Sequence, residues 1–169
     1  MAVTQQIVRI SHLQLNDCSN DPQRLNELIS FKLTEPEDEI DLNWAPAGME
    51  LYFKKSEQLH SVRKALKLVL DGEALLYEHF PSGPIDDSVD SDITFLSSPK
   101  VIAMANEFES INWTNLYSCM PRNKIDAFKS LSCDLTCHPD EYYLPEIKKL
   151  VAFVKQAAKQ NMALVQWWN

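Results

Sequence analysis

The C-terminal segment most constrains the fold, because it joins a helical stripe directly to an apolar strand. The apolar positions at helical spacing in residues 145–159 are Ile147, Leu150, Val151, Val154, Ala157 and Ala158. A Gln160-Asn161 turn follows, and the run MALVQWWN predicts a strand with Trp167 and Trp168 on opposite faces. A one-sided helix followed at once by a strand requires a sheet with helices packed on it.

The N-terminus shows a second strand pattern. In TQQIVRISHL, Ile7 and Arg9 fall on one face and Val8 and Ile10 on the other. Between the two strands, capping residues and apolar spacing predict amphipathic helices that begin at Pro22, Ser56, Ser98, Pro121 and Pro145. The predicted fold class is therefore α+β, a single compact domain over residues 1–169 with several helices packed on a small sheet and strands near both termini.

Details of these helices and loops follow from the same spacing. The helix after Asp21 carries Leu25, Leu28, Ile29 and Leu33, and the one from Ser56 ends near Gly72. The helix from Pro121 is expected to pack Ile125, Phe128 and Leu131 on the core. Residues 42–53 are expected to form a loop that enters the core, and residues 77–92 an exposed loop.

Acidic residues outnumber basic ones over most of the chain. The formal net charge is −8, with five basic and ten acidic residues in positions 1–60, seven and twelve in 61–140, and four and two in 141–169. Such a charge repels nucleic-acid phosphates and attracts basic proteins, so we expect no nucleic-acid partner.

The chain also shows no sign of membrane insertion or export. No apolar run approaches the roughly 20 residues of a membrane span, and the N-terminus lacks the pattern of a signal peptide. We therefore expect a cytoplasmic protein without a membrane partner. In that compartment the four cysteines are expected to remain thiols: Cys18, Cys119, Cys133 and Cys137.

The strongest metal-like pattern is CDLTCHP. Cys133, Cys137 and His138 would need Cys119 or His79 to complete a tetrahedral zinc site, and the spacing is not that of a zinc finger. Structural thiols beside a surface histidine are the simpler interpretation, so no metal or cofactor is predicted. The aspartates of residues 86–92 lack the central glycine and terminal glutamate of an EF-hand, so calcium is not predicted either.

Three runs together resemble a known family. They are IDLNWAPAGMELYF, GPIDDSVDSDITFLSSPKVIAMANEF and YYLPEIKKLVAFVKQAAKQNMALVQWW, in this order along nearly the whole chain. Their pattern is similar to the YfbM-like family of bacterial domains of unknown function. The resemblance implies a compact α+β fold and no established activity, although some members lie near toxin and immunity genes. Ala45 and Pro46 follow Trp44 where the family commonly has a histidine.

Common catalytic signatures are missing from the sequence. Gly48, Gly72 and Gly83 do not form a phosphate-binding loop, and neither a GxSxG nor an HExxH motif occurs. The sequence therefore favours a non-enzymatic protein-binding module, and most specifically an immunity protein whose acidic face blocks a basic bacterial toxin. The residues predicted to bind this partner are Glu37, Asp38, Glu39, Asp41, Trp44, Asp86, Asp87, Asp90 and Asp92.

Two alternatives remain open at this stage. One is an enzyme acting on a small molecule, with His79, His138 or the loop from Asp86 to Asp92 as acid or base. A deep polar pocket with titrating groups of perturbed pKa would favour that alternative. The other is a housekeeping domain that forms a homodimer through its terminal strand or helix, which an exposed apolar patch would favour.

Overall fold

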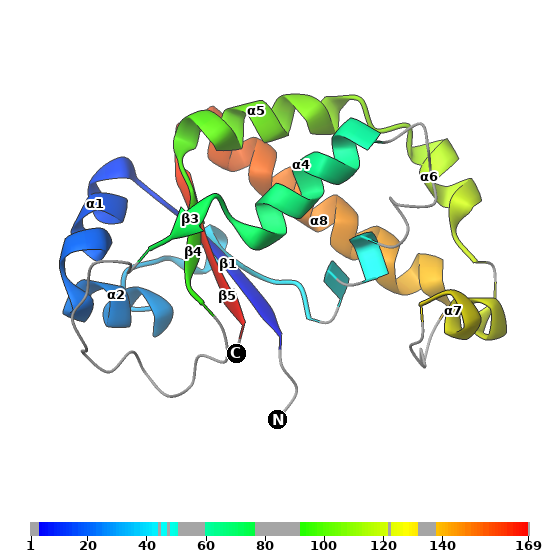
Figure 1. Ribbon diagram of the computed structural model, residues 1–169, viewed down its shortest axis with the longest axis horizontal. Coiled ribbons are helices and arrows are strands. Elements are labelled where there is room, and N and C mark those ends of the chain that lie inside the picture. Colours follow the sequence, from blue (N-terminus) through cyan, green and yellow to red (C-terminus); the bar gives the residue numbers. More distant parts are fainter. Residues whose placement is uncertain are drawn as a thin grey trace.

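The computed structural model describes residues 4–43, 45–46, 48–50, 60–76, 92–121, 123–131 and 138–168. Within these residues one antiparallel sheet has the strand order β2-β1-β5-β4-β3. The strands are β1 (Gln5–Ile10), β2 (Glu39–Asp41), β3 (Ala74–Leu75), β4 (Thr94–Leu96) and β5 (Ala163–Trp168). The two terminal strands β1 and β5 pair along their full length near the middle of the sheet, with Gln5 at the start of β1 opposite Trp168 at the end of β5 (Figure 1).

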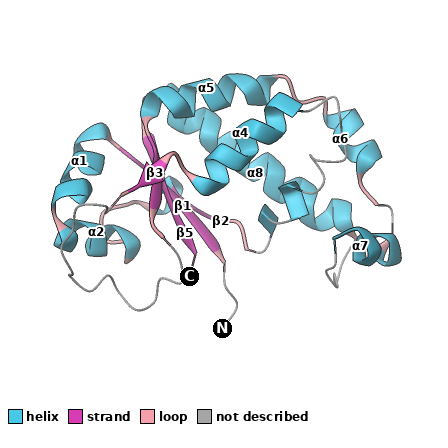
Figure 2. Cartoon of the chain, in the orientation of Figure 1, coloured by secondary structure: helices cyan, strands magenta, loops and turns pink. Residues whose placement is uncertain are grey.

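Helices cover both faces of this sheet (Figure 2). On one face lie α1 (His12–Asn20) and α2 (Pro22–Ile29), and on the other α4 (His60–Asp71), α5 (Ser98–Glu109) and α8 (Pro139–Lys159). The smaller helices α6 (Trp113–Cys119) and α7 (Lys124–Leu131) lie at the end of the molecule remote from α1. The predicted α+β fold class, with strands near both termini, is confirmed. No helix in the described part of the chain is long and apolar enough to span a membrane.

Strand alternation divides the buried side chains between two cores. Val8, Ile10 and Val165 pack with the α1–α2 layer, whereas Ile7 and Leu164 pack with α4, α5 and α8. The same alternation is the basis of the prediction that Trp167 and Trp168 point to opposite faces of the sheet. Trp167 is buried in the α1–α2 core, with its ring centroid 5.5 Å from that of Phe31, while Trp168 is only partly buried.

The helix α1 was not predicted. Its only buried side chains are Leu15 and Cys18, so it has no apolar stripe to recognise. The available signal was its capping box, in which the Ser11 hydroxyl accepts from the Gln14 backbone N–H and the Gln14 side chain accepts from the Ser11 backbone N–H.

The helix after Asp21 begins as predicted but is shorter. The Asp21 carboxylate accepts from the Gln23 backbone N–H, and Pro22 occupies the first turn. The helix ends at Ile29 and does not reach Leu33, because Phe31 adopts a positive φ of 56° that interrupts helical geometry.

The segment that follows also contains more regular structure than expected. Residues 36–38 form a 3₁₀ turn and the next three residues form the edge strand β2, which continues the sheet beside β1. Leu42, Ala45 and Met49 are fully buried, as expected for a segment that enters the core, but residues 45–46 and 48–50 are helical rather than loop. The short strands β3 and β4 were likewise not predicted.

The helices α4 and α5 match their predictions where the structure describes them. The predicted cap Ser56 lies outside the described residues, but α4 ends before Gly72, whose φ is +79°. The helix α5 begins at Ser98, followed by Pro99 in its first turn.

Two predictions about the C-terminal half are wrong. Ile125 and Phe128 of α7 do not pack on the core, because 68% and 57% of their surfaces are exposed, and α7 begins at Lys124 rather than Pro121. The long helix α8 begins at Pro139, so Pro145 lies inside it instead of opening it. Pro139 is the residue that occupies the first helical position, where a proline needs no hydrogen-bond partner.

Candidate functional site

The predicted acidic segment, residues 35–41, has its central carboxylate bound to the sheet. The Arg9 side chain on β1, 7% exposed, donates to the Asp38 carboxylate at 2.5 Å. The Arg9 guanidinium also lies 5.3 Å from the centroid of the Phe153 ring on α8. The carboxylate of Asp38 therefore compensates an otherwise buried cation.

The two carboxylates of β2 have structural partners as well. Glu39 accepts a hydrogen bond from the Thr34 hydroxyl, and Asp41 accepts from the Asn43 backbone N–H at 2.6 Å. The Lys149 ammonium on α8 donates to the Asp41 backbone carbonyl at 2.6 Å. The backbone of the acidic segment is thus held in position from both β1 and α8.

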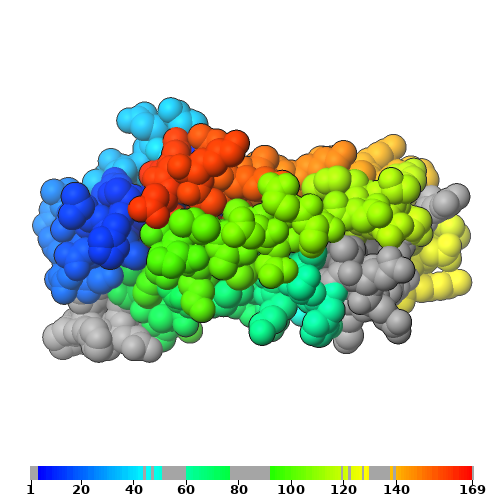
Figure 3. Space-filling view, turned by 90° about the horizontal axis from the view of Figure 1, so that it is seen from above, coloured from blue at the N-terminus to red at the C-terminus, as the bar shows by residue number. Residues whose placement is uncertain are grey.

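The exposed carboxylates of this segment precede β2. Glu35 and Glu37 are both exposed, on either side of Pro36. Figure 3 shows the light-blue segment before β2 protruding from the body of the molecule. These two side chains are the ones best placed for contact with another molecule.

The second predicted acidic cluster is described only at its end. Trp44, Asp86, Asp87 and Asp90 lie outside the described residues. Asp92 is exposed and precedes β4, so β1 and β5 lie between it and β2. At about 4.8 Å per strand spacing, Asp92 and Asp41 are separated by roughly 14 Å of sheet. The structure therefore does not place them side by side.

Asp92 instead lies beside a pocket at the end of the sheet that has both polar and apolar lining, the latter including Leu70 and Trp167. The pocket has a volume of about 270 Å³. Its walls come from β1, β4, β5 and the end of α4, and include Gln5, Asp71, Asp92, Thr94, Gln166 and Trp168. The register explains this grouping, because Gln166 pairs with Thr94 and Gln5 pairs with Trp168 on adjacent strands.

The two glutamines of this pocket are almost completely buried, each with 1% of its surface exposed. The Gln5 side-chain amide donates to the Leu70 carbonyl at 2.7 Å, but its oxygen has no hydrogen-bond partner among the described residues. Neither the oxygen nor the nitrogen of the Gln166 amide has a partner in the same part of the chain. Buried polar atoms are normally hydrogen-bonded, and these three atoms are exceptions within the described residues.

Gly72 forms the tight wall behind this pocket. A Cβ atom at this position would lie 2.5 Å from the Thr94 hydroxyl and 2.6 Å from the Gln166 amide nitrogen. Both the positive φ and this close approach require glycine. The C-terminal end of α4 therefore lies directly against polar side chains of β4 and β5.

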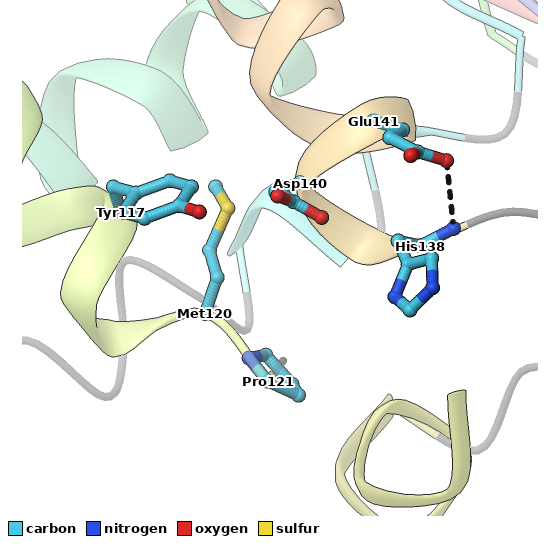
Figure 4. A pocket seen from close by; sticks show the side chains of 6 residues that line it. All are labelled: Tyr117, Met120, Pro121, His138, Asp140 and Glu141. Carbon is cyan, nitrogen blue, oxygen red and sulfur yellow. Dashed lines mark hydrogen bonds between the residues drawn. The ribbon is translucent and has the colours of Figure 1, made fainter. Parts of the chain in front are cut away.

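A second pocket, of about 200 Å³, lies at the N-terminus of α8 and contains the histidine considered for metal binding. In Figure 4 the His138 ring points away from the Glu141 carboxylate, which accepts from the His138 backbone N–H at 3.3 Å. No group of three histidine, cysteine or acidic side chains converges within the described residues. Cys133, Cys137 and His79 lie outside them, so the zinc hypothesis on those residues is untested.

Sequence reasoning missed Gln5 and Gln166. Their signal was weak but present, since both interrupt apolar strands: Gln5 precedes Ile7 by two positions, and Gln166 stands between Val165 and Trp167. The strand patterns assigned residues to two faces but did not indicate which positions are buried. Because helices cover both faces of the sheet, these polar positions are buried.

Comparison with known proteins gives a fold without an activity. No model of a protein family matches the sequence, and no curated protein matches it. Among solved structures, the chain is similar to YfbM from Escherichia coli, which is described as a protein of unknown function. The TM-score is 0.61 at 12% sequence identity, covering 98% of this chain and 99% of that chain. The resemblance to the YfbM-like family is thus confirmed at the level of the fold.

Proposed function

We propose that this protein is a non-enzymatic binding module for a basic protein partner and acts in the cytoplasm. Its most specific form would be an immunity protein that neutralises a bacterial toxin. The observation that carries the proposal is the rigid support of the acidic segment, in which exposed Glu35 and Glu37 stand next to a backbone held by Arg9 and Lys149. A surface already fixed in its binding conformation loses little entropy on association.

The charge of the whole chain supports the same partner class. A net charge of −8 accelerates encounter with a basic surface, and the effect weakens as salt screens it. Glu39 and Asp41 lie on an edge strand, where charged side chains discourage strand addition by another chain. The proposed contact is therefore made by side chains, with Trp44 as an aromatic anchor.

The test uses a basic toxin domain as the binding partner, for which a toxin-like reading frame immediately upstream of the gene would be the first candidate. Glu35→Lys and Glu37→Lys together should slow association at low salt by about tenfold or more and reduce survival of cells that express the toxin. Lys replacement at Asp86, Asp87, Asp90 and Asp92 tests the second predicted cluster in the same way. Dissociation should respond instead to Trp44→Ala.

Asp17 supplies a matched control, because it is an exposed acid on α1, outside the acidic segment. Asp17→Lys changes the net charge in the same direction and should leave protection intact. Equal association rates for wild type and both clusters of Lys variants, with cooperative melting retained, would refute the acidic contact surface.

A further inference from the structure

The pocket between Gln5 and Gln166 has a chemistry that the proposed contact with a toxin does not use. Its lining includes the carboxylates of Asp71 and Asp92, of which Asp71 pairs with the Lys67 ammonium at 2.6 Å beside the pocket. The buried floor is polar but uncharged, with both glutamines at 1% exposure. The Asp92 carboxylate at the rim, over a neutral polar floor, favours a cationic group that enters with hydrogen-bond donors first.

The hydrogen-bonding capacity of the floor can be assigned atom by atom. The Leu70 carbonyl can only accept, so the nitrogen of the Gln5 amide must face it and the Gln5 oxygen must face the pocket as an acceptor. The Gln166 amide offers one further acceptor and one donor group, whichever way it is turned, because neither atom has a described partner. Acceptors therefore predominate.

The two glutamines are spaced for a ligand with several donors. Gln5 pairs across the strands with Trp168, and Gln166 lies two residues before Trp168 on β5. Such diagonal positions are about 7 to 8 Å apart in a sheet, within reach of long side chains, so both glutamine amides can contact one ligand that carries several donors. Trp168, half-buried beside them, supplies an aromatic surface on which a flat cation can stack.

We propose that this pocket binds a guanidinium group. Guanidinium is planar and carries five donors in a fixed fork. Because it is more weakly hydrated than an ammonium ion, it loses less hydration free energy when it binds to the buried floor of the pocket. In this arrangement its N–H groups donate to the oxygens of Gln5 and Gln166, while Asp92 balances its charge from the rim. A volume of about 270 Å³ leaves room for such a group.

The guanidinium group has two sources, a free small molecule or an arginine side chain of another protein. Calorimetric titration with methylguanidine tests the group itself, free L-arginine tests the first source, and a capped Gly-Arg-Gly peptide tests the second. L-Citrulline is the matched control for L-arginine, since its side chain has nearly the same shape and no charge. We expect saturable binding of methylguanidine below about 10 mM, and no binding of citrulline in that range.

Variants localise the binding. Gln166→Met keeps the side-chain length but removes both polar atoms, and should weaken methylguanidine binding by at least about tenfold. Asp92→Asn should weaken it less, and mainly at low salt. Glu35→Lys and Glu37→Lys, which test the acidic contact surface, should leave it unchanged, so the two proposals fail independently.

Three outcomes would overturn the assignment. They are equal binding of citrulline, wild-type affinity in a folded Gln166→Met variant, and the lack of saturable binding by any of the three guanidinium probes. Preference for the peptide over free arginine would assign the group to a protein partner, and the reverse preference would assign it to a small molecule.

Discussion

The acidic segment and the glutamine pocket differ in how their polar atoms are satisfied. In the acidic segment, Asp38, Glu39 and Asp41 all have hydrogen-bond donors from the chain itself. In the pocket, Gln166 has none among the described residues although it is buried. The density of acidic residues in the sequence indicated the first region. The second region is indicated by buried amide atoms that have no hydrogen-bond partner among the described residues.

This difference distinguishes two ways in which a polar residue can affect the stability of the folded protein. A carboxylate with an internal donor stabilises the fold and holds neighbouring groups in place, so its removal should destabilise the protein. A buried amide without a partner costs stability in the free protein and regains that cost only when a ligand supplies the missing hydrogen bonds. Removing a partnered carboxylate should therefore lower the free energy of unfolding, whereas removing an unpartnered buried amide should raise it.

The largest effect is expected for Gly72→Ala at the wall of the pocket. Its Cβ would lie 2.5 Å from Thr94 side-chain atoms, and the residue would have to hold a φ of +79°. Strain and overpacking together should lower the free energy of unfolding by about 3 kcal/mol or more. Urea denaturation measures this loss, with Asp71→Ala as the neighbouring control. A change below about 1 kcal/mol would show that the pocket wall yields easily.

Asp38→Ala should produce the next largest effect, because it leaves the buried Arg9 cation without its carboxylate. Loss of one partner from a fully buried pair costs about 3 to 5 kcal/mol, and the partial exposure of Asp38 reduces the expected loss to about 2 to 3 kcal/mol. Exposed Glu37, one position earlier, is the control, and Glu37→Ala should change stability by less than about 0.5 kcal/mol. Similar losses in both variants would contradict the structural role of Asp38.

Gln166→Met should act in the opposite direction. It removes two buried polar atoms without described partners and should stabilise the unliganded protein by about 1 to 2 kcal/mol. Gln5→Met should destabilise it by about 1 kcal/mol, since the Leu70 carbonyl would lose its donor. Thermal and urea denaturation of both variants measures whether each substitution raises or lowers the stability. Destabilisation by Gln166→Met would mean that its amide is already satisfied in the unliganded protein.

The fold was predictable where sequence periodicity and burial agree. Ile7 and Ile10 mark β1, Asp21 and Pro22 mark the start of α2, and the C-terminal stripe marks most of α8. The short strands β2, β3 and β4 have two or three residues each, too few to show alternation. Their positions depend on pairing with β1 and β5, which is a property of the assembled sheet.

The candidate sites could likewise be predicted from the sequence only in part. The acids of residues 35–41 were visible as a charge cluster, but their internal partners Arg9 and Thr34 were not. All six residues of β1 are buried because helices cover both faces, and the polar residues of QQIVRI gave no indication of this burial. Recognising Gln5 and Gln166 as a site required knowing which hydrogen bonds the folded chain leaves unmade.

The smallest effect is expected from Cys18, a buried polar group in the other core whose contribution varies with pH. Burial between α1 and α2, reinforced by the nearby Asp17 carboxylate, raises the pKa of its thiol from 9.0 to about 11. The folded protein therefore retains the proton more strongly than the unfolded chain. The stability that this provides is fully present below pH 9 and is lost as the pH rises through 11.

Wild-type protein should accordingly lose about 1 kcal/mol between pH 8 and pH 10 through this thiol alone. Cys18→Ala should lower stability at pH 8 through lost packing but should remove this part of the pH dependence. Urea denaturation of both proteins at each pH isolates the thiol, because the other titrating groups are common to both. Identical pH slopes would show that Cys18 ionises as readily in the folded protein as in the unfolded chain, and that its burial, unlike that of Gln166, carries no energetic cost.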